Sequence, residues 1–444
     1  MERWEIPPHR DPSRTRVLRE QWRAGGRRHV WQRRIAPNRT TDREHTGRSG
    51  GGGTLEAFRE WIAGSALPAW STLGFDAAAG RFRERLDERG APLDVPHRAM
   101  VQARQIYVYS QAHQLGWHEG GAELAVRAMV SLQRDFARDA DGMTSFAYSI
   151  DGRGGIASDV RDAYTHAFVL FATAWLYRVT GDPTLLTLAE RTDAFVRKHL
   201  VDARHGGVFD SHPATKRTKR QNPLMHLLEA YLALERSAPG RGWLARAATV
   251  IDLFRSRLFD ARRRTLLEYF AEDWSAHSDP AFADVVEPGH HFEWVWLLGE
   301  YEELAGIQLA ESRAALHRFA LVHGLSNDGL VYDELASDGS VRKHSHRVWP
   351  HTEAIKAAGA RRADGAAGAD ALAATMSVTL LERFLDRPFP GGWIDHIAAD
   401  GAPLVDYVPA SSLYHLMFAA ADANARSLRQ ARLATSDAGA PVVR

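Results

Sequence analysis

A unit of about 60 residues recurs along the chain, and this repeat restricts the fold more than any other feature of the sequence. Each unit contains a segment that combines a turn with β-favouring or aromatic residues, as a short hairpin does. The spacings between these segments are 68, 65, 58, 64 and 63 residues, measured at Gly74, Gly142, Gly207, Thr265, Gly329 and Gly392. Between them, apolar residues recur at i, i+3, i+4 and i+7, as in 122–137 and 186–200, which is typical of amphipathic helices.

Two helices and one hairpin in each of six units predict about twelve helices. The compact way to bury both helix layers is an all-α (α/α)6 toroid, with inner helices around a central pocket and the short β-hairpin loops at one end. An open solenoid is the alternative arrangement of the same units. We expect residues 54–424 to form this barrel as one domain, although a length of 444 residues would ordinarily suggest two or three.

The two ends of the chain differ from the repeats. Residues 1–50 contain 13 Arg against 6 acidic residues, and "GRSGGGGT" at 47–54 resembles a flexible linker. We interpret residues 1–53 as a basic, disordered extension; a nucleic-acid-binding tail or a transit peptide is the alternative. Residues 425–444 are predicted to be a polar C-terminal tail.

Composition excludes several classes of protein. The formal net charge is +1, so the chain as a whole has no field that would hold nucleic acid or an anionic membrane. It has no cysteine, which excludes disulfides and thiolate chemistry. No apolar run approaches the roughly 20 residues of a membrane-spanning helix, and no signal peptide is evident at the N-terminus. These observations favour a cytoplasmic protein.

Polar residues recur in phase with the predicted helices. One lies near the start of each inner helix, at intervals of 62, 60, 64, 63 and 62 residues: Arg104, His166, His226, His290, Glu353 and His415. In a closed toroid these positions converge on one cavity at the same end of the ring. Such a concave pocket with a few convergent polar groups is the usual location of a ligand site.

The segment "VEPGHHFEWVWLL" (286–298) shows how one such helix start is interpreted. The adjacent His290 and His291 point about 100° apart on a helix and cannot easily chelate one metal ion. His290 and Glu293 share a face at i and i+3, so we expect both to face the pocket. His291 is expected to be structural, and Trp294 and Trp296 to belong to the core.

Several histidines, a glutamate and an arginine around one pocket favour proton abstraction next to a carbonyl. Histidine exchanges a proton near neutral pH, so two of them offer an acid and a base. Arg104 can stabilise an enediolate oxygen, and Glu229, three residues after His226, can orient the His226 ring. This chemistry is that of sugar isomerisation or epimerisation.

Other chemistries explain less of the pattern. A metal held by His166, His226, His290 and His415 across four helices is geometrically possible. Glycoside hydrolysis needs two carboxylates, which Glu229, Glu293 and Glu353 could supply, but it leaves the repeated histidines unexplained. A non-catalytic sugar-binding toroid would need no titratable histidine pair. No nucleotide-binding fingerprint is present.

Seven ordered motifs resemble the N-acylglucosamine 2-epimerase superfamily, most closely its D-mannose isomerase branch. The matching stretches span residues 104–416 and are "RQIYVYSQA", "DAYTHAFVLFA", "RQNPLMHLLEA", "EPGHHFEWVWLL", "WPHTEAIKA", "GGWIDH" and "DYVPASSLYHL". The resemblance implies an (α/α)6 barrel and proton transfer through an enediol or enediolate, without a metal or another cofactor.

The resemblance also implies roles for individual residues. His226 and His415 are the expected acid–base pair, with Glu229 as the partner of His226. His166 and His290 are expected to help in substrate binding or ring opening. Arg104 is expected to bind the carbonyl-side oxygens, and Trp349, Glu353 and Glu293 to line the pocket.

The sequence therefore predicts an aldose–ketose isomerase that interconverts unphosphorylated sugars, with D-mannose and D-fructose as the best match. Its only expected partner is a monosaccharide substrate. No phosphate clamp is evident, although Arg217, Lys219 and Arg220 lie near one pocket helix. The alternative is a 2-epimerase of N-acetylglucosamine, glucose or a cellobiose-type sugar, because the same histidines can return the proton to either carbon.

Overall fold

Six helices form the inner layer of the described fold. They are buried around most of their circumference, because one side of each faces the lumen and the other faces an outer helix. A computed structural model describes residues 52–214 and 216–437. Within this range the inner helices are α4 (Ala99–Gln114), α6 (Ala163–Thr180), α8 (Asn222–Ser237), α10 (Pro288–Ala305), α12 (Trp349–Ala363) and α14 (Leu413–Asp437). Residues 1–51, on which the predicted N-terminal extension depends, lie outside the described residues.

The outer helices are amphipathic. In α5, for example, Ala125, Met129 and Leu132 are buried on one face, while Glu123 and Arg134 on the other face are exposed. The outer layer within the described range consists of α2 (Gly52–Trp61) continued through the π-turn η1 (Ile62–Ala66) into α3 (Leu67–Thr72), then α5 (Gly121–Asp135), α7 (Pro183–Phe195), α9 (Trp243–Leu253), α11 (Ala310–His323) and α13 (Ala369–Thr379).

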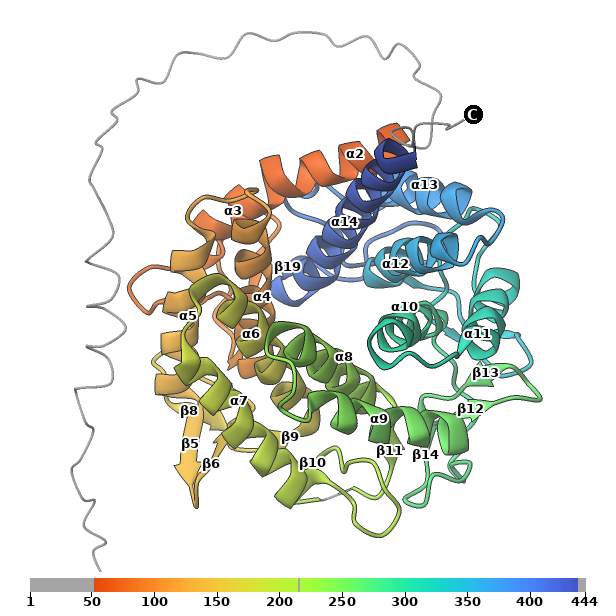
Figure 1. Cartoon of the computed structure of the whole chain (residues 1–444). Coiled ribbons are helices and arrows are strands. Elements are labelled where there is room, and N and C mark those ends of the chain that lie inside the picture. Colours follow the sequence, from red (N-terminus) through yellow and green to blue (C-terminus); the bar gives the residue numbers. More distant parts are fainter. Residues whose placement is uncertain (1–51, 215, 438–444) are drawn as a thin grey trace, which may run out of the picture. The chain divides into compact units, whose positions relative to one another are not determined.

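The inner helices form a closed ring (Figure 1). Each packs against the next in sequence order, and α14 packs against both α12 and α4, which closes the ring. A second contact across the closure is the pairing of β19 (Tyr407–Pro409) with β3 (Arg85–Asp87). The predicted (α/α)6 toroid is therefore confirmed, and the open solenoid is not the arrangement of these residues.

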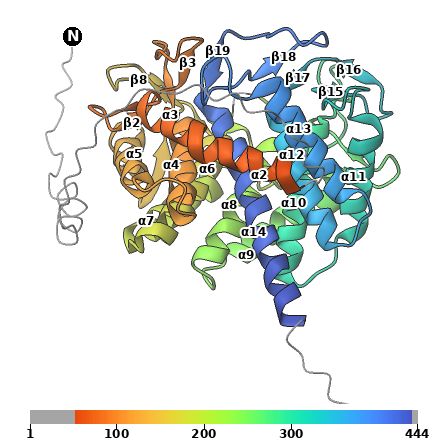
Figure 2. The same ribbon diagram turned by 90° about the horizontal axis from the view of Figure 1, so that it is seen from above.

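Short strands lie at one end of the ring, where the inner helices begin (Figure 2). Hairpins follow outer helices, as the repeat predicts; they pair β1 (Phe75–Asp76) with β2 (Arg81–Phe82), β5 (Ala137–Ala140) with β6 (Met143–Phe146), β12 (Phe259–Asp260) with β13 (Thr265–Leu266), and β15 (Glu334–Leu335) with β16 (Val341–Lys343).

Other strand pairs link neighbouring units at the same end: β9 (Arg161–Asp162) with β10 (Ser211–His212), β11 (Lys219–Arg220) with β14 (Tyr269–Phe270), β17 (His346–Arg347) with β18 (His396–Ile397), and β4 (His97–Arg98) with β7 (Ser149–Ile150) and β8 (Ile156–Ser158). The strands therefore form a collar around one mouth of the toroid.

Three buried histidines fasten hairpins to inner helices. The Nε2 atoms of His166, His291 and His351 accept hydrogen bonds from backbone N–H groups of the preceding hairpin, at 3.1, 3.1 and 3.0 Å. Each ring also packs against a phenylalanine near the end of an outer helix, Phe195, Phe319 or Phe384. Burial lowers the pKa of these rings to about 4, 4 and 3, so each stays neutral and keeps its acceptor nitrogen.

The C-terminal boundary differs from the prediction. Residues 425–444 were expected to be a polar tail, but α14 continues to Asp437. The polar composition of this segment is compatible with helix, because Ala, Leu, Arg and Gln are good helix formers. In the described part of the chain, no helix is long and apolar enough to cross a membrane.

Candidate active site

Polar side chains from the first turns of the inner helices meet beneath the strand collar. They are buried, with exposed fractions of 6 % or less, and come from α4, α8, α10, α12 and α14: Arg104, His226, Glu229, His290, Glu293, Glu353 and His415. The toroid brings them together because the inner helices all begin at this mouth. Their mutual contacts define the candidate active site.

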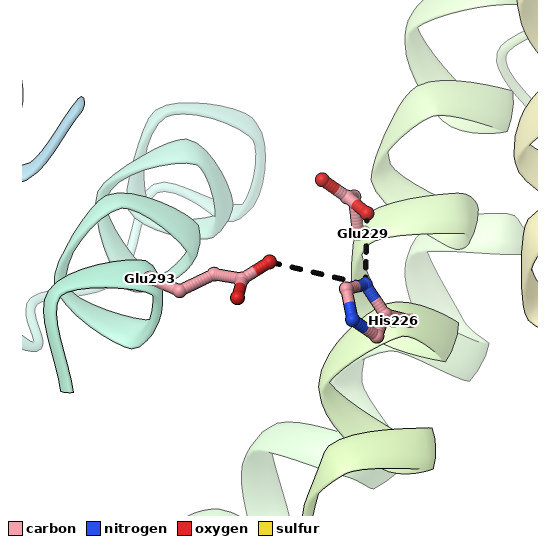
Figure 3. A group of neighbouring side chains, drawn as sticks. All are labelled: His226, Glu229 and Glu293. Carbon is pink, nitrogen blue, oxygen red and sulfur yellow. Dashed lines mark hydrogen bonds and ion pairs between the residues drawn. The ribbon is translucent and has the colours of Figure 1, made fainter. Parts of the chain in front are cut away.

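His226 and Glu229 form the first acid–base dyad (Figure 3). His226 Nδ1 lies 3.1 Å from Glu229 Oε2, as the i, i+3 spacing on α8 predicts. The Tyr414 hydroxyl donates to both Glu229 oxygens at 2.6 Å. Burial lowers the pKa of His226 to about 4 despite Glu229, so this imidazole is neutral. Burial alone would raise the pKa of Glu229, but its bonds to His226 and Tyr414 and the charge of Lys356 lower it, so this carboxylate is ionised.

His415 and Glu353 form a second dyad of the same design. His415 Nδ1 lies 2.8 Å from Glu353 Oε1, and the ammonium of Lys356 lies 2.7 Å from the other oxygen. Burial and the positive charges of Arg104 and Lys356 hold the pKa of His415 well below its usual value. His415 is therefore a neutral imidazole whose Nε2 has no partner among the described residues, as a general base requires.

His290 carries the opposite charge state. Its Nδ1 lies 2.9 Å from Glu268 and 3.7 Å from Glu287, and its Nε2 lies 2.9 Å from the side-chain amide of Asn222. Burial lowers its pKa, but the two carboxylates outweigh burial and raise the pKa to about 9. His290 is therefore an imidazolium at neutral pH and can serve as a general acid.

The indole of Trp349 lies between these two histidines. Its ring centroid is 4.9 Å from that of His290 and 5.4 Å from that of His415. Gly289 makes the close approach possible, because a Cβ at this position would lie 2.7 Å from the Trp349 ring. The protonated and the neutral histidine are thus held against the same aromatic ring.

Arg104 supplies a fixed positive charge. Its guanidinium donates to the backbone carbonyl of Ser411 at 3.1 Å and to the Tyr164 hydroxyl at 2.5 Å. It also lies over the rings of Phe168 and Tyr414, at 4.2 and 4.8 Å from their centroids. Arg104 forms no ion pair with a carboxylate of the described residues, so its charge remains available to an oxyanion.

Glu293 is a buried acid of a different kind. Its Oε1 lies 3.8 Å from His226 Nδ1, and Figure 3 shows it reaching from α10 toward the imidazole on α8. Neither of its oxygens has a hydrogen-bond partner within the described range. Burial and the charges of Glu353 and Glu229 raise its pKa well above the usual value, so Glu293 is protonated.

Eight of the nine residues that the sequence nominates lie in this cluster, and His166 does not. Both ring nitrogens of His166 are engaged by backbone groups, Nε2 by the N–H of Phe146 and Nδ1 by the carbonyl of Asp162 at 2.7 Å. The expected catalytic role of His166 is therefore replaced by a structural one, like that of His291. Five residues that contact this cluster were not nominated from the sequence: Tyr164, Asn222, Glu268, Lys356 and Tyr414. Lys356 and Tyr414 lie near nominated residues in the sequence, and this proximity is the signal that could have identified those two.

Two groups of side chains could hold a metal ion. Ligand atoms of His226, Glu229 and Glu293 lie within 4.8 Å of one another, and so do those of Glu268, Glu287 and His290. In each group a protonated member opposes binding, since Glu293 and His290 must both lose a proton to act as ligands. Acid–base chemistry explains these charge states more directly.

The fold and the site together define a helical toroid whose inner helices bring several buried histidines and carboxylates together at one mouth. Residues 80–419 match the N-acylglucosamine 2-epimerase (GlcNAc 2-epimerase) family. The chain belongs to this family of sugar isomerases and epimerases.

Two relatives and one solved structure illustrate the similarity. The mannose-6-phosphate isomerase of Rhizobium meliloti (strain 1021) is 32 % identical over 372 residues, which cover 81 % of this chain and 94 % of the relative. The D-mannose isomerase of Thermobifida fusca is 30 % identical and covers 67 % of this chain and 79 % of the relative. The cellobiose 2-epimerase of Bacillus thermoamylovorans B4167 shares the fold, with a TM-score of 0.76 at 19 % identity over 84 % of this chain and all of that chain.

Proposed function

We propose that this protein is an aldose–ketose isomerase that interconverts D-mannose and D-fructose. The observation that carries the proposal is the pair of histidines against Trp349, one protonated and one neutral. Isomerisation needs a base that removes a proton from carbon and an acid that protonates the carbonyl oxygen, and this pair supplies both at neutral pH.

The reaction follows from these charge states. His415 removes the proton from C2 of the open-chain aldose while His290 protonates O1, which gives an enediol. His415 then returns its proton to C1, and His290 takes the proton of the C2 hydroxyl, which leaves the C2 ketone. Arg104 stabilises the negative charge that develops on the oxygens in both steps. Both histidines end in the state in which they began.

This assignment differs from the one expected from the sequence, which paired His226 with His415. Two neutral imidazoles offer no acid, whereas His290 is charged. We therefore assign ring opening to the His226–Glu229 dyad, since a neutral imidazole oriented by a carboxylate can accept the proton of the anomeric hydroxyl and deliver a proton to the ring oxygen as the C1–O5 bond breaks.

An unphosphorylated substrate is supported by the pairing of the nearby basic residues. Arg217 pairs with Glu272, Lys219 with Asp202 and Arg220 with Asp210. A phosphate group would have to compete with these carboxylates. Because one relative bears the name mannose-6-phosphate isomerase, mannose 6-phosphate is the necessary comparison substrate.

A 2-epimerase of N-acetylglucosamine, glucose or a cellobiose-type sugar is the second candidate, and the protonated Glu293 favours it. An acid beside His226 could return a proton to C2 from the face opposite His415. The first product formed from mannose distinguishes the two reactions, since epimerisation yields glucose and isomerisation yields fructose.

The test is incubation with D-mannose in D2O. We expect fructose as the first product, deuterium bound to carbon, and retained activity after EDTA treatment. His415→Asn and His290→Asn should each lower kcat by about 100-fold or more. His226→Asn should lower the rate less for substrate that is already in the open-chain form, because that form needs no ring opening. Turnover of mannose 6-phosphate alone, or glucose as the first product, contradicts the proposal, whereas the amount of carbon-bound deuterium reports how far the proton held by His415 exchanges with solvent.

A further inference from the structure

A second cavity lies at the opposite end of the lumen from the strand collar. It encloses about 170 Å³ between the C-terminal halves of α4, α6, α8, α10 and α14. The candidate active site lies around the N-terminal turns of the inner helices, so the two spaces occupy opposite ends of the ring. Glu229, which orients His226, lies at the inner end of this second cavity and thus near both spaces.

Four of the six charged residues that line the second cavity pair with one another, whereas Glu229 pairs with His226 and Arg178 has no such pair. Arg236 lies 2.8 Å from Glu300, and Arg426 lies 2.7 Å from Asp422. Arg178 also lines the cavity but forms no ion pair with any carboxylate in the described part of the chain. A partly buried arginine with no carboxylate at ion-pair distance is stabilised when a ligand supplies an anionic group.

The Arg178 side chain is nevertheless held in one place. Its Nε donates to Ser237 Oγ at 2.7 Å, and its Nη2 donates to the carbonyl of Ala233 at 3.0 Å. Its guanidinium also lies 4.1 Å from the centroid of the Trp175 ring. These contacts leave Nη1 without a partner. The group is thus oriented in advance, as binding residues are in ligand sites.

Four aromatic side chains form part of the wall. Phe171 and Trp175 come from α6, Trp296 from α10 and Phe418 from α14. Trp296 is fixed by a hydrogen bond of 3.0 Å from its indole nitrogen to Asp422. Such a wall favours an organic ligand with an apolar or sugar-like face over a bare inorganic ion.

We propose that this second cavity binds a small organic carboxylate, whose carboxylate group pairs with Arg178 and whose body packs against Trp175 and Trp296. The site is separate from the sugar site and does not depend on the reaction assigned to it. Since the cavity reaches Glu229, the bound anion lies close enough to influence the His226–Glu229 dyad.

Isothermal titration with gluconate, a six-carbon hydroxy acid, tests the proposal. The matched pair of variants is Arg178→Gln and Arg104→Gln, because both arginines lie on inner helices and lack a carboxylate partner. We expect Arg178→Gln to raise the Kd for gluconate by about tenfold or more, the loss typical of one charge-assisted hydrogen bond. Arg104→Gln should leave this binding unchanged.

A third variant keeps the test valid if Arg178→Gln is poorly folded. Ala425 lines the cavity and is exposed, so Ala425→Leu should fill the cavity opening without disturbing the core, and it should weaken gluconate binding with Arg178 intact. No saturable binding to the wild-type protein overturns the proposal. Binding that Arg104→Gln abolishes and Arg178→Gln leaves intact also overturns it, because gluconate would then occupy the sugar site.

Discussion

Lys356 has no exposed surface and yet lies beside three buried glutamates. Its ammonium is 2.7 Å from Glu353 and lies over the rings of Trp296 and Phe418, at 4.4 and 4.2 Å from their centroids. Burial lowers its pKa, but Glu353, Glu293 and Glu229 outweigh burial and raise it, so Lys356 remains charged. It is therefore the counter-charge of the Glu353 carboxylate beneath His415.

Replacing this counter-charge should weaken the proposed base. In Lys356→Met, the Glu353 carboxylate that contacts His415 is left buried without the cation that lies 2.7 Å from it. We expect kcat to fall roughly 10- to 100-fold, the range typical of losing an orienting partner, with a smaller change in KM. Steady-state kinetics over a pH series measures the effect.

Because the chain has no cysteine, Lys356 also permits a chemical rescue. Lys356→Cys can be alkylated with 2-bromoethylamine while unfolded and then refolded, which restores an ammonium of nearly the same length. Recovered activity supports the role of the charge. Full activity in Lys356→Met would show that the His415–Glu353 dyad works without this lysine.

The protonated state of His290 sets the basic limit of activity. Its pKa is raised to about 9, so the acid form persists through neutral pH and is lost as the pH rises through that value. We expect kcat/KM for mannose to fall above about pH 9 and, in Glu268→Gln, to fall at a lower pH because one of the two carboxylates is gone. A basic limb that does not move in this variant would contradict the assignment of His290 as the acid.

The attachment of the hairpins to the inner helices depends on histidines that are neutral. The folded-state pKa values of His166, His291 and His351 are about 4, 4 and 3, whereas an unfolded histidine titrates near 6.5. Below about pH 6.5 the unfolded chain therefore binds more protons than the folded one, and the stability that these residues contribute is lost as the pH falls toward 4.

The free energy of unfolding should consequently decrease between pH 6.5 and 4. Each proton that the unfolded chain binds in excess of the folded one changes the free energy of unfolding by about 1.4 kcal/mol per pH unit. The three hairpin histidines contribute up to one such proton each. Urea unfolding at pH 7, 6 and 5 measures the slope, and His351→Gln should reduce it. A stability that is constant over this range would show that the three rings are already charged in the folded protein.

The same histidines explain why the sequence located the helices better than it located the site. The repeat predicts where each inner helix begins, but residues one position apart on a helix point about 100° apart. His166 follows the spacing of the pocket residues, at 62 residues from Arg104 and 60 from His226, yet it occupies the hairpin-anchoring position of His291 and His351. Spacing alone cannot tell which of these two helix faces a residue occupies, whereas the backbone hydrogen bonds of its imidazole ring can.

Charge states could not be predicted from the sequence either. Glu268 lies after a hairpin, and its effect on His290 depends on a 2.9 Å contact between two different units of the repeat. The helical toroid, in contrast, follows from periodicity and was predicted correctly. The extent of α14 was not, because polar composition alone does not distinguish a helix from an irregular tail.

The folding stability of the toroid depends on closure of the ring of helices by α14. α14 packs against α12, α4 and α2, and β19 pairs with β3. A chain that ends at residue 409 would expose the lumen-facing apolar residues of α4 and α12 to water. We expect residues 52–409 to lose cooperative thermal unfolding, as measured by calorimetry, whereas residues 52–437 should retain it. A sharp transition in the shorter chain would mean that α14 is an appendage of an otherwise stable arc.

Closure by α14 also has a consequence during protein synthesis. The last inner helix to leave the ribosome carries Tyr414, which holds Glu229, and His415, the proposed base. A nascent chain can assemble five of the six inner helices and still lack the group that removes a proton from the sugar. With His415 as the base, we therefore expect catalysis to begin only when translation has passed the final repeat, so that partly made chains and premature termination products are inactive.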